Sequence, residues 1–245
     1  TLPMLDFVEL WVYLTTGPLF GLTSTVIVYV LAQAIYSQFN HAPWANPVLW
    51  SVLFIASILL LTGIQYPVYF AGAQFIHVLL GPAVVALAWP LWQRRAALKN
   101  AWRELLFAAL AGGAAAIASA FILGKLLGLP MTVLLSMVPK SVTAPVAMGV
   151  AQQIGGIPAL AAVFAVLTGM IGAISAKYIF DFFGIKTDPL GWSQRGFALG
   201  TAAHGIGAAR ALQVNADAGA YAALALAVQV LLASILIPIG MQILR

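Results

Sequence analysis

Long apolar stretches recur along nearly the whole of this 245-residue chain, and several reach the ~20 residues with which a helix crosses a ~30 Å hydrocarbon core. Only 7% of the residues are charged, whereas a typical soluble domain carries about 25%. So little charge would not cover the surface of a water-soluble fold. The sequence therefore predicts an integral membrane protein, with the lipid bilayer as its surroundings.

The spanning elements are expected to be helices. A membrane barrel is built from strands of about 10 residues with alternating polarity, and runs rich in Ala, Leu and Gly, such as 105–123, show no alternation. We therefore expect an all-α fold that forms a single membrane domain over residues 1–245. Eight hydrophobic segments are expected: 17–39, 48–66, 74–92, 103–127, 131–152, 157–180, 195–213 and 219–244.

The 11 Lys and Arg residues outnumber the 6 Asp and Glu residues, so the net charge is +5. In a soluble protein this excess would indicate a nucleic-acid partner. In a membrane protein the cations of the loops set the orientation instead, so we expect no nucleic acid. By the positive-inside rule the most basic loop, 93–103, is expected on the cytoplasmic side.

Two internal similarities at almost the same spacing predict that the chain contains two repeats. Residues 80–83 align with residues 199–202 after a shift of 119, and Pro18 aligns with Pro139 after a shift of 121. Such repeats are typical of pseudo-symmetric transporters and channels; the alternative is chance similarity between Ala/Leu/Gly-rich segments. The predicted repeats cover approximately residues 14–128 and 130–245.

The excess of basic residues changes side between the two halves, which predicts that the repeats are inverted. Inversion requires an odd number of crossings in each half. We therefore expect at least one broken or re-entrant segment per half, at the places where Gly and Pro interrupt the helices.

The first candidate site is a predicted break in a helix. Pro139 and Pro145 cannot both lie inside a regular helix without disrupting its hydrogen bonds. Lys140 between them would cost about 2.5–3.5 kcal/mol at membrane depth, which indicates an anionic ligand with Ser141 and Thr143 as hydroxyl contacts. Alternatively, Lys140 extends to the membrane interface.

The second candidate site is the glycine-rich stretch 200–210. Its glycines allow either exposed backbone amides or, as the alternative, tight helix packing; they are Gly200, Gly205 and Gly207.

Positive side chains in the same stretch point to an anion site, because cations and free N–H donors together attract anions. Thr201 would add a hydroxyl, Arg210 a fixed charge, and His204 a proton for coupling, since an unperturbed histidine titrates at about pH 6.5. The alternatives are a hydrogen bond between helices for His204 and extension to the membrane surface for Arg210.

Two further features rank lower. Gln152 and Gln153 are either substrate contacts or part of a polar turn, and Gly81 with Pro82 is the counterpart of 200–201 in the first repeat. The chain contains no cysteine, its three histidines lack metal-ligand spacing, and it carries no nucleotide or hydrolase motif. We therefore expect no enzyme, no metal site and no cofactor.

At the two candidate sites the sequence resembles the LrgB/CidB family of bacterial membrane proteins. The resemblance covers nearly the whole chain, and the order and spacing of the motifs are more specific than any one of them. The matching stretches are 18–21, 79–88, 139–148, 155–158, 168–169 and 204–207, with Pro238 near the end.

The resemblance implies a location in the bacterial plasma (inner) membrane. Members are named for holin-like and antiholin-like control of murein hydrolases and cell lysis, usually beside a small LrgA/CidA-type membrane partner. Related proteins, including a chloroplast-envelope fusion, resemble carriers of small carboxylates such as glycolate, glycerate and pyruvate. A lytic pore does not need two interrupted, polar segments in matching repeats.

We therefore expect a secondary carrier, coupled to protons or another ion, for small 2-hydroxy or 2-oxo monocarboxylates of the glycolate, glycerate, pyruvate and lactate type. The alternative is a holin/antiholin-like regulator of murein hydrolases that acts with an LrgA/CidA-type partner. A homo-oligomer is expected, and in the alternative the small residues at 112–113 and 169–172 would form helix contacts.

Overall fold

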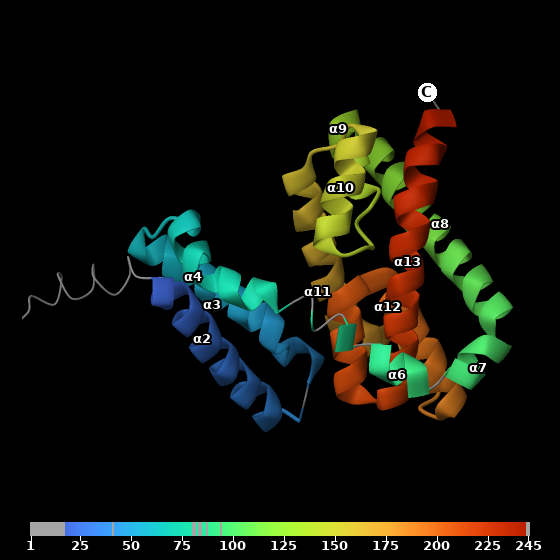
Figure 1. Ribbon diagram of the computed structural model, residues 1–245, viewed down its shortest axis with the longest axis horizontal. Coiled ribbons are helices and arrows are strands. Elements are labelled where there is room, and N and C mark those ends of the chain that lie inside the picture. The colour runs from blue at the N-terminus through green and yellow to red at the C-terminus, as the bar shows by residue number, and fades with distance from the viewer. Residues whose placement is uncertain are drawn as a thin grey trace, which may run out of the picture. The chain divides into compact units, whose positions relative to one another are not determined.

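The computed structural model describes residues 18–40, 42–79, 82, 85–86, 88–93 and 95–243 (Figure 1). Every secondary-structure element in this part of the chain is a helix, which confirms the predicted all-α class. Contacts divide the chain into two compact units, one that ends at Ala86 and one that starts at Leu87. The predicted division into inverted repeats near residue 129 stays a prediction.

Four described helices are long and apolar enough to cross a membrane: Leu19–Gln38, Trp102–Leu126, Pro158–Phe182 and Ala216–Gln242.

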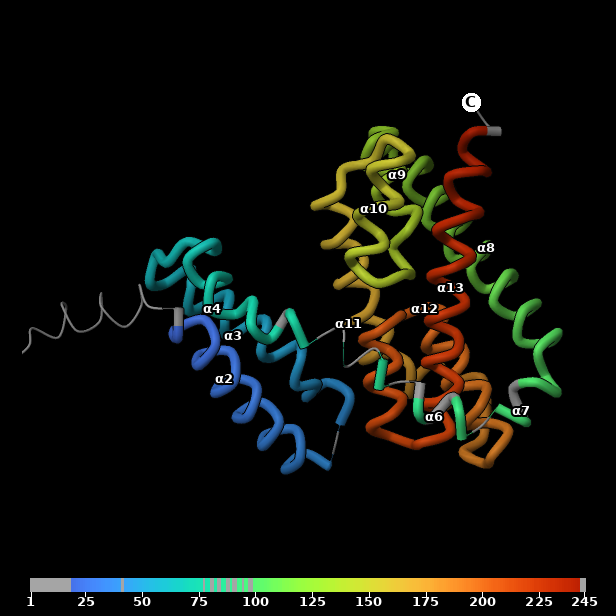
Figure 2. Tube along the Cα trace, viewed as in Figure 1, coloured from blue at the N-terminus to red at the C-terminus, as the bar shows by residue number. Residues whose placement is uncertain are grey.

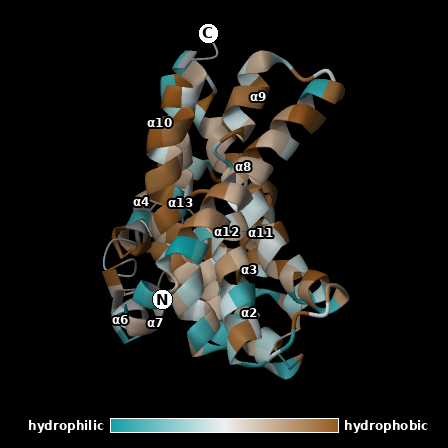
Figure 3. Ribbon diagram, turned by 90° about the vertical axis from the view of Figure 1, so that its right-hand side faces the viewer, coloured by the Kyte–Doolittle hydropathy of each residue, from teal (hydrophilic) through white to brown (hydrophobic). Residues whose placement is uncertain are grey.

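Large apolar side chains cover the outside of these helices. Phe107, Leu126 and Phe182 are 74%, 78% and 85% exposed. In Figure 3 hydrophobic residues recur along α8 (Trp102–Leu126), α9 (Met131–Met137) and α10 (Ala144–Ile154). Such a surface is stable in lipid and not in water. The chain is thus an integral membrane protein, although eight crossing segments are not confirmed.

The first unit is a cluster of helices around α2. The hydroxyls of Thr25 and Tyr69 lie 2.7 Å apart, and the missing side chain of Gly21 lets α2 approach the backbone of α4. Asn46 caps the next helix by accepting hydrogen bonds from the amides of Val48 and Leu49. The elements are α2 (Pro18–Gln38), η1 (Pro43–Ala45), α3 (Pro47–Thr62) and α4 (Tyr66–Val78).

The second unit packs around buried alanines, which allow close helix contact. One core cluster joins α9, α10, α11 and α13, and another joins α11, α12 and α13. The helices are α6 (Ala88–Gln93), α7 (Arg95–Asn100), α8 (Trp102–Leu126), α9 (Met131–Met137), α10 (Ala144–Ile154), α11 (Pro158–Phe182), α12 (Pro189–Val214) and α13 (Ala216–Ile243).

The segment that contains the two prolines is broken where they predict a break. Helix α9 ends at Met137, and α10 begins only after the turn 138–143. After α10 the chain lies beside α9 again: the Ile157 amide donates to Ser136 Oγ, in the last turn of α9, at 2.7 Å. A Cβ on Gly156 would also lie 2.9 Å from the Ser136 amide nitrogen. Helices α9 and α10 therefore form a hairpin with residues 138–143 at its tip.

Helix α12 is also a hairpin, with its reversal at His204. The backbone of His204 is not helical, at φ 41° and ψ −133°. In a continuous helix, residues eight apart are separated by about 12 Å along the axis. A Cβ on Gly207 would instead lie 2.6 Å from the carbonyl oxygen of Leu199. The arms Pro189–Ala203 and Gly205–Val214 thus lie side by side, and the segment can be followed in orange in Figure 2.

The two hairpins start from opposite ends of α11. The first hairpin ends just before α11, and the second begins just after it. Helix α11 itself has 25 residues. At 1.5 Å per residue α11 is about 37 Å long. The arms of α12, with 15 and 10 residues, reach only about 22 and 15 Å, which is too short to cross a ~30 Å hydrocarbon core.

Candidate functional site

The tips of the two hairpins meet beside the middle of α11. A Cβ on Gly205, in the second tip, would lie 3.9 Å from Cγ2 of Thr143 in the first tip. Next to it, Nε2 of His204 lies 2.8 Å from the carbonyl oxygen of Ala165 in α11. The structure therefore brings together two sequence motifs that are about 60 residues apart.

The first tip presents a cation, two hydroxyls and a helix N-terminus. Lys140 and Ser141 are partly buried, and Nζ of Lys140 lies 3.4 Å from Ser141 Oγ. Pro139 is fully buried beneath them. Thr143 is the N-cap residue of α10, but its side chain does not cap the helix. The first amides of α10 have no acceptor within the helix, and the helix dipole makes this end attractive to anions.

The second tip is built around His204, which is only 4% exposed. Its positive φ is unfavourable for any residue with a Cβ. The ring is held by Ala165, whose carbonyl accepts the hydrogen bond from Nε2–H. Gly169 leaves room for the ring, because a Cβ there would lie 2.9 Å from Nε2. The interhelical hydrogen bond expected as an alternative for His204 is therefore present.

The three glycines of the stretch 200–210 contact different parts of the structure. Gly200 packs against the backbone of α13 at Ala222, and Gly207 allows the arms of α12 to come together. These two fit the packing interpretation of the sequence. Gly205 lies at the tip and faces Thr143.

Thr201 lies one turn before the tip and faces α8. Its methyl group would lie 2.9 Å from a Cβ on Gly112, and the residue is 6% exposed. Within the described chain, its hydroxyl oxygen is buried and has no hydrogen-bond partner.

The remaining predicted residues lie elsewhere. Gln152 and Gln153 are exposed at the far end of α10, where Gly155 ends the helix at φ 91°. Pro145 is exposed in the first turn of α10, and Pro82 is exposed in the first unit. Gly81 is outside the described residues.

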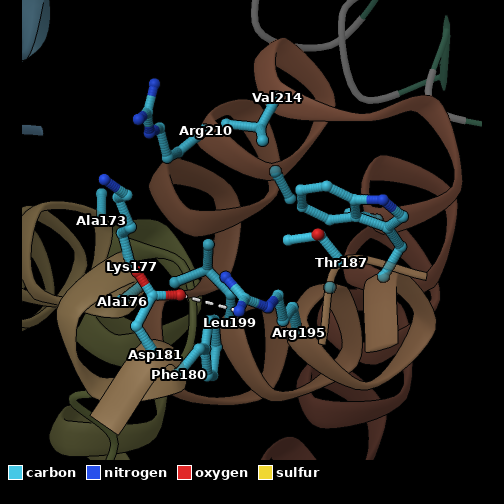
Figure 4. Close-up of a pocket in the computed structure, with 14 residues that line it drawn as sticks. Ala173, Ala176, Lys177, Phe180, Asp181, Thr187, Arg195, Leu199, Arg210 and Val214 are labelled. Atoms are coloured by element: carbon cyan, nitrogen blue, oxygen red, sulfur yellow. Dashed lines mark hydrogen bonds and ion pairs between the residues drawn. The ribbon is translucent and has the colours of Figure 1, made fainter. Parts of the chain in front are cut away.

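Arg210 lines a pocket of about 240 Å³ between α11, the two arms of α12 and the start of α13 (Figure 4). Sequence reasoning missed the other charged residues of this pocket, which are Lys177, Asp181 and Arg195. Nη2 of Arg195 donates to Asp181 at 2.8 Å, and its Nε donates to the carbonyl of Ile185 at 3.1 Å. In sequence these residues look like ordinary loop charges, because only the reversal of α12 brings them together.

Described His, Asp and Glu residues form no group of three that could hold a metal ion.

The sequence is similar to a known family of proteins and to several curated relatives. The model of the LrgB-like family matches residues 25–243. YwbG of Bacillus subtilis (strain 168) is 34% identical over 80% of this chain and 84% of its own length. Holin-like protein CidB of Staphylococcus epidermidis is 29% identical over 88% of this chain and 92% of its own length. No solved structure matches the chain. Because the family match covers most of the sequence, the chain belongs to the LrgB-like family.

Proposed function

We propose that this protein is a secondary carrier of small 2-hydroxy or 2-oxo monocarboxylates, and that it binds them where the two hairpin tips meet. The main support for the proposal is the close approach of the two tips, because a Cβ on Gly205 would lie 3.9 Å from Cγ2 of Thr143. Two short hairpins that start from opposite ends of α11 and meet near its middle give a site that each side of the membrane can reach in turn.

The chemistry of the tips favours an anion. Lys140 supplies the charge, and Ser141 and Thr143 supply hydroxyls that can bind the carboxylate or a 2-hydroxyl. Two helices, α10 and the second arm of α12, begin at the tips, and the positive ends of their dipoles therefore face the site. In a medium of low dielectric constant these contributions are stronger than in water.

His204 is the proposed carrier of the coupled proton. It occupies the second tip, and its ring is oriented by the carbonyl of Ala165. A histidine that gains and loses a proton beside a bound carboxylate would couple substrate movement to the proton gradient.

The second candidate is a holin-like role, which the name of the staphylococcal relatives favours. In that case the protein would assemble in the membrane, with further copies or with an LrgA/CidA-type partner. An apolar groove between α8 and α13, lined by Gly113, Ala114 and Gly240, is a suitable contact for another helix.

Uptake of labelled glycolate, pyruvate and lactate into proteoliposomes, with and without an inward proton gradient, tests the proposal. A carrier gives saturable uptake of at least one acid. Lys140→Met is expected to abolish it, because the change removes the cation at the site and keeps a similar side-chain length.

Lys125→Met is the matched control, since Lys125 is an exposed residue at the end of α8 and should not affect uptake. If the wild-type protein takes up none of the acids and releases encapsulated dye unselectively, the holin-like role replaces the carrier.

A further inference from the structure

The pocket that contains Arg210 extends alongside the second hairpin toward its tip. Asp181 and Thr187, near the loop between α11 and α12, line its outer end. Ala173 and Leu199 line its inner end. A Cβ on Gly172, the neighbour of Ala173, would lie 2.6 Å from Cβ of Ala203, which immediately precedes His204. The pocket thus extends from the base of the hairpin to Ala173, and to Leu199, which lies near the tip along the chain.

The lining of the pocket is positively charged. Among the described residues that line it are three cations, Lys177, Arg195 and Arg210, and one acid, Asp181, which gives this part of the lining a formal charge of +2. The carboxylate of Asp181 pairs with Arg195. In Figure 4 the side chains of Lys177 and Arg210 both lie at the edge of the group of pocket residues, and the guanidinium of Arg210 points away from the Arg195–Asp181 pair. Positive charge in a hollow with apolar walls concentrates anions.

The volume of the pocket and the apolar character of its walls limit the kind of anion that it can bind. The volume of about 240 Å³ is below the roughly 300–1,000 Å³ of sites for drug-sized molecules. The walls between the charges are apolar and include Phe180, Trp192 and Leu199. A compact anion with few carbon atoms fits such a pocket better than a polyanion does.

We infer that this pocket is a second anion-binding site, which a small monocarboxylate occupies between the base of the α12 hairpin and the hairpin tips. The inference rests on the proposed function, because it names the path by which the substrate reaches the central site. Arg195, held by Asp181 and Ile185, shapes the pocket, while Lys177 and Arg210 bind the carboxylate.

Trp192 in the pocket wall allows binding to be measured without transport. Glycolate is titrated into the purified protein while tryptophan emission is recorded, and Trp192→Phe identifies the part of the signal that comes from the pocket. We expect a saturable change that Lys177→Met and Arg210→Met each weaken by about tenfold, the factor for one lost hydrogen bond to a charged group. Arg210→Lys should retain more of the affinity than Arg210→Met.

Two control variants separate the pocket from other parts of the protein. Lys125→Met removes a cation outside the pocket, and Lys140→Met removes the cation at the hairpin tips; both should leave the Trp192 signal unchanged. An unchanged affinity in both Lys177→Met and Arg210→Met would overturn the inference. So would a signal that short-chain phosphatidylglycerol produces and glycolate does not, because the pocket would then hold a lipid phosphate.

Uptake measurements distinguish this inference from the proposed function. In proteoliposomes, Lys177→Met and Arg210→Met should raise the half-saturating glycolate concentration about tenfold with little change in the maximal rate, whereas Lys140→Met abolishes uptake. If the wild type binds glycolate at Trp192 without taking it up, the carrier proposal fails and the anion site stands. If uptake is saturable and neither pocket variant changes it, the pocket is not on the path.

Discussion

At the scale of single residues, His204 combines a strained backbone with a buried, hydrogen-bonded ring. Its φ of 41° and ψ of −133° are accessible mainly to glycine. The contacts of the ring with Ala165 and Gly169 offset this strain. Such strain at a buried polar residue is typical of functional sites.

The strain at His204 can be measured by comparing two substitutions. His204→Ala and His204→Gly both remove the hydrogen bond to Ala165, but only glycine accepts the backbone conformation without strain. We expect His204→Ala to be less stable than His204→Gly by about 1–3 kcal/mol, as measured by thermal unfolding in detergent. Equal stability of the two variants would show that His204 is not strained.

The proposed proton coupling predicts a different outcome for His204→Gln. The glutamine amide can still donate to the Ala165 carbonyl but does not titrate near neutral pH. Uptake should therefore lose its stimulation by an inward proton gradient, while exchange of labelled for unlabelled glycolate continues. Stimulation equal to that of the wild type would assign the coupling to another residue.

At the scale of elements, the reversal of α12 depends on a glycine in the second arm. We expect Gly207→Ala to destabilise the protein by about 1–3 kcal/mol, because the new methyl group would overlap Leu199. Gly149→Ala in α10 is the matched control: nothing lies within 4 Å of its new Cβ, so the change should be neutral or stabilise the helix by up to about 1 kcal/mol. Thermal unfolding measures both. If Gly207→Ala left the stability of the protein unchanged, α12 would have to continue straight through His204.

The sequence predicted the first hairpin better than the second. Two prolines six residues apart require a break, and α9 and α10 are separated there. The break at His204 has no proline, and for its glycines tight packing between helices was an alternative to a broken helix. The reversal follows from tertiary packing, in which Gly207 meets Leu199 and Ala203.

For the candidate site, too, the sequence did not predict features that depend on tertiary packing. The sequence predicted Lys140, Thr143, His204 and Gly205 as site residues, and the structure places their two motifs in contact. The sequence also predicted Arg210 as a site residue, but it did not predict Lys177 and Arg195, the other cations of the pocket that Arg210 lines. These residues are spread over 34 positions and two helices, so their proximity depends on the direction of each arm of α12.

At the scale of the whole molecule, the basic loop predicts the orientation. Two of its arginines lie against aromatic rings: the guanidinium of Arg95 is 4.4 Å from the ring of Trp92, and that of Arg103 is 5.4 Å from the ring of Trp102. Arginine and tryptophan together are typical of the membrane interface. By the positive-inside rule we predict that this end of α8 lies on the cytoplasmic side.

Labelling of a single cysteine checks this orientation. The natural chain contains no cysteine, so Lys99→Cys provides the only thiol. A membrane-impermeant maleimide should label it in inside-out vesicles and not in intact cells. Labelling in intact cells would reverse the assigned orientation.

If transport takes place where the two hairpin tips meet, a reversible cross-link between the tips should block it. Thr143→Cys and Gly205→Cys would place two thiols close to each other in an otherwise cysteine-free sequence, because a Cβ on Gly205 lies 3.9 Å from Cγ2 of Thr143. Glycolate uptake into proteoliposomes is measured for the reduced, the oxidised and the re-reduced protein, with each single-cysteine variant as a control. We predict that oxidation stops uptake by the double variant only and that reduction restores it. If the cross-linked protein still takes up glycolate at the full rate, transport does not take place between the hairpin tips.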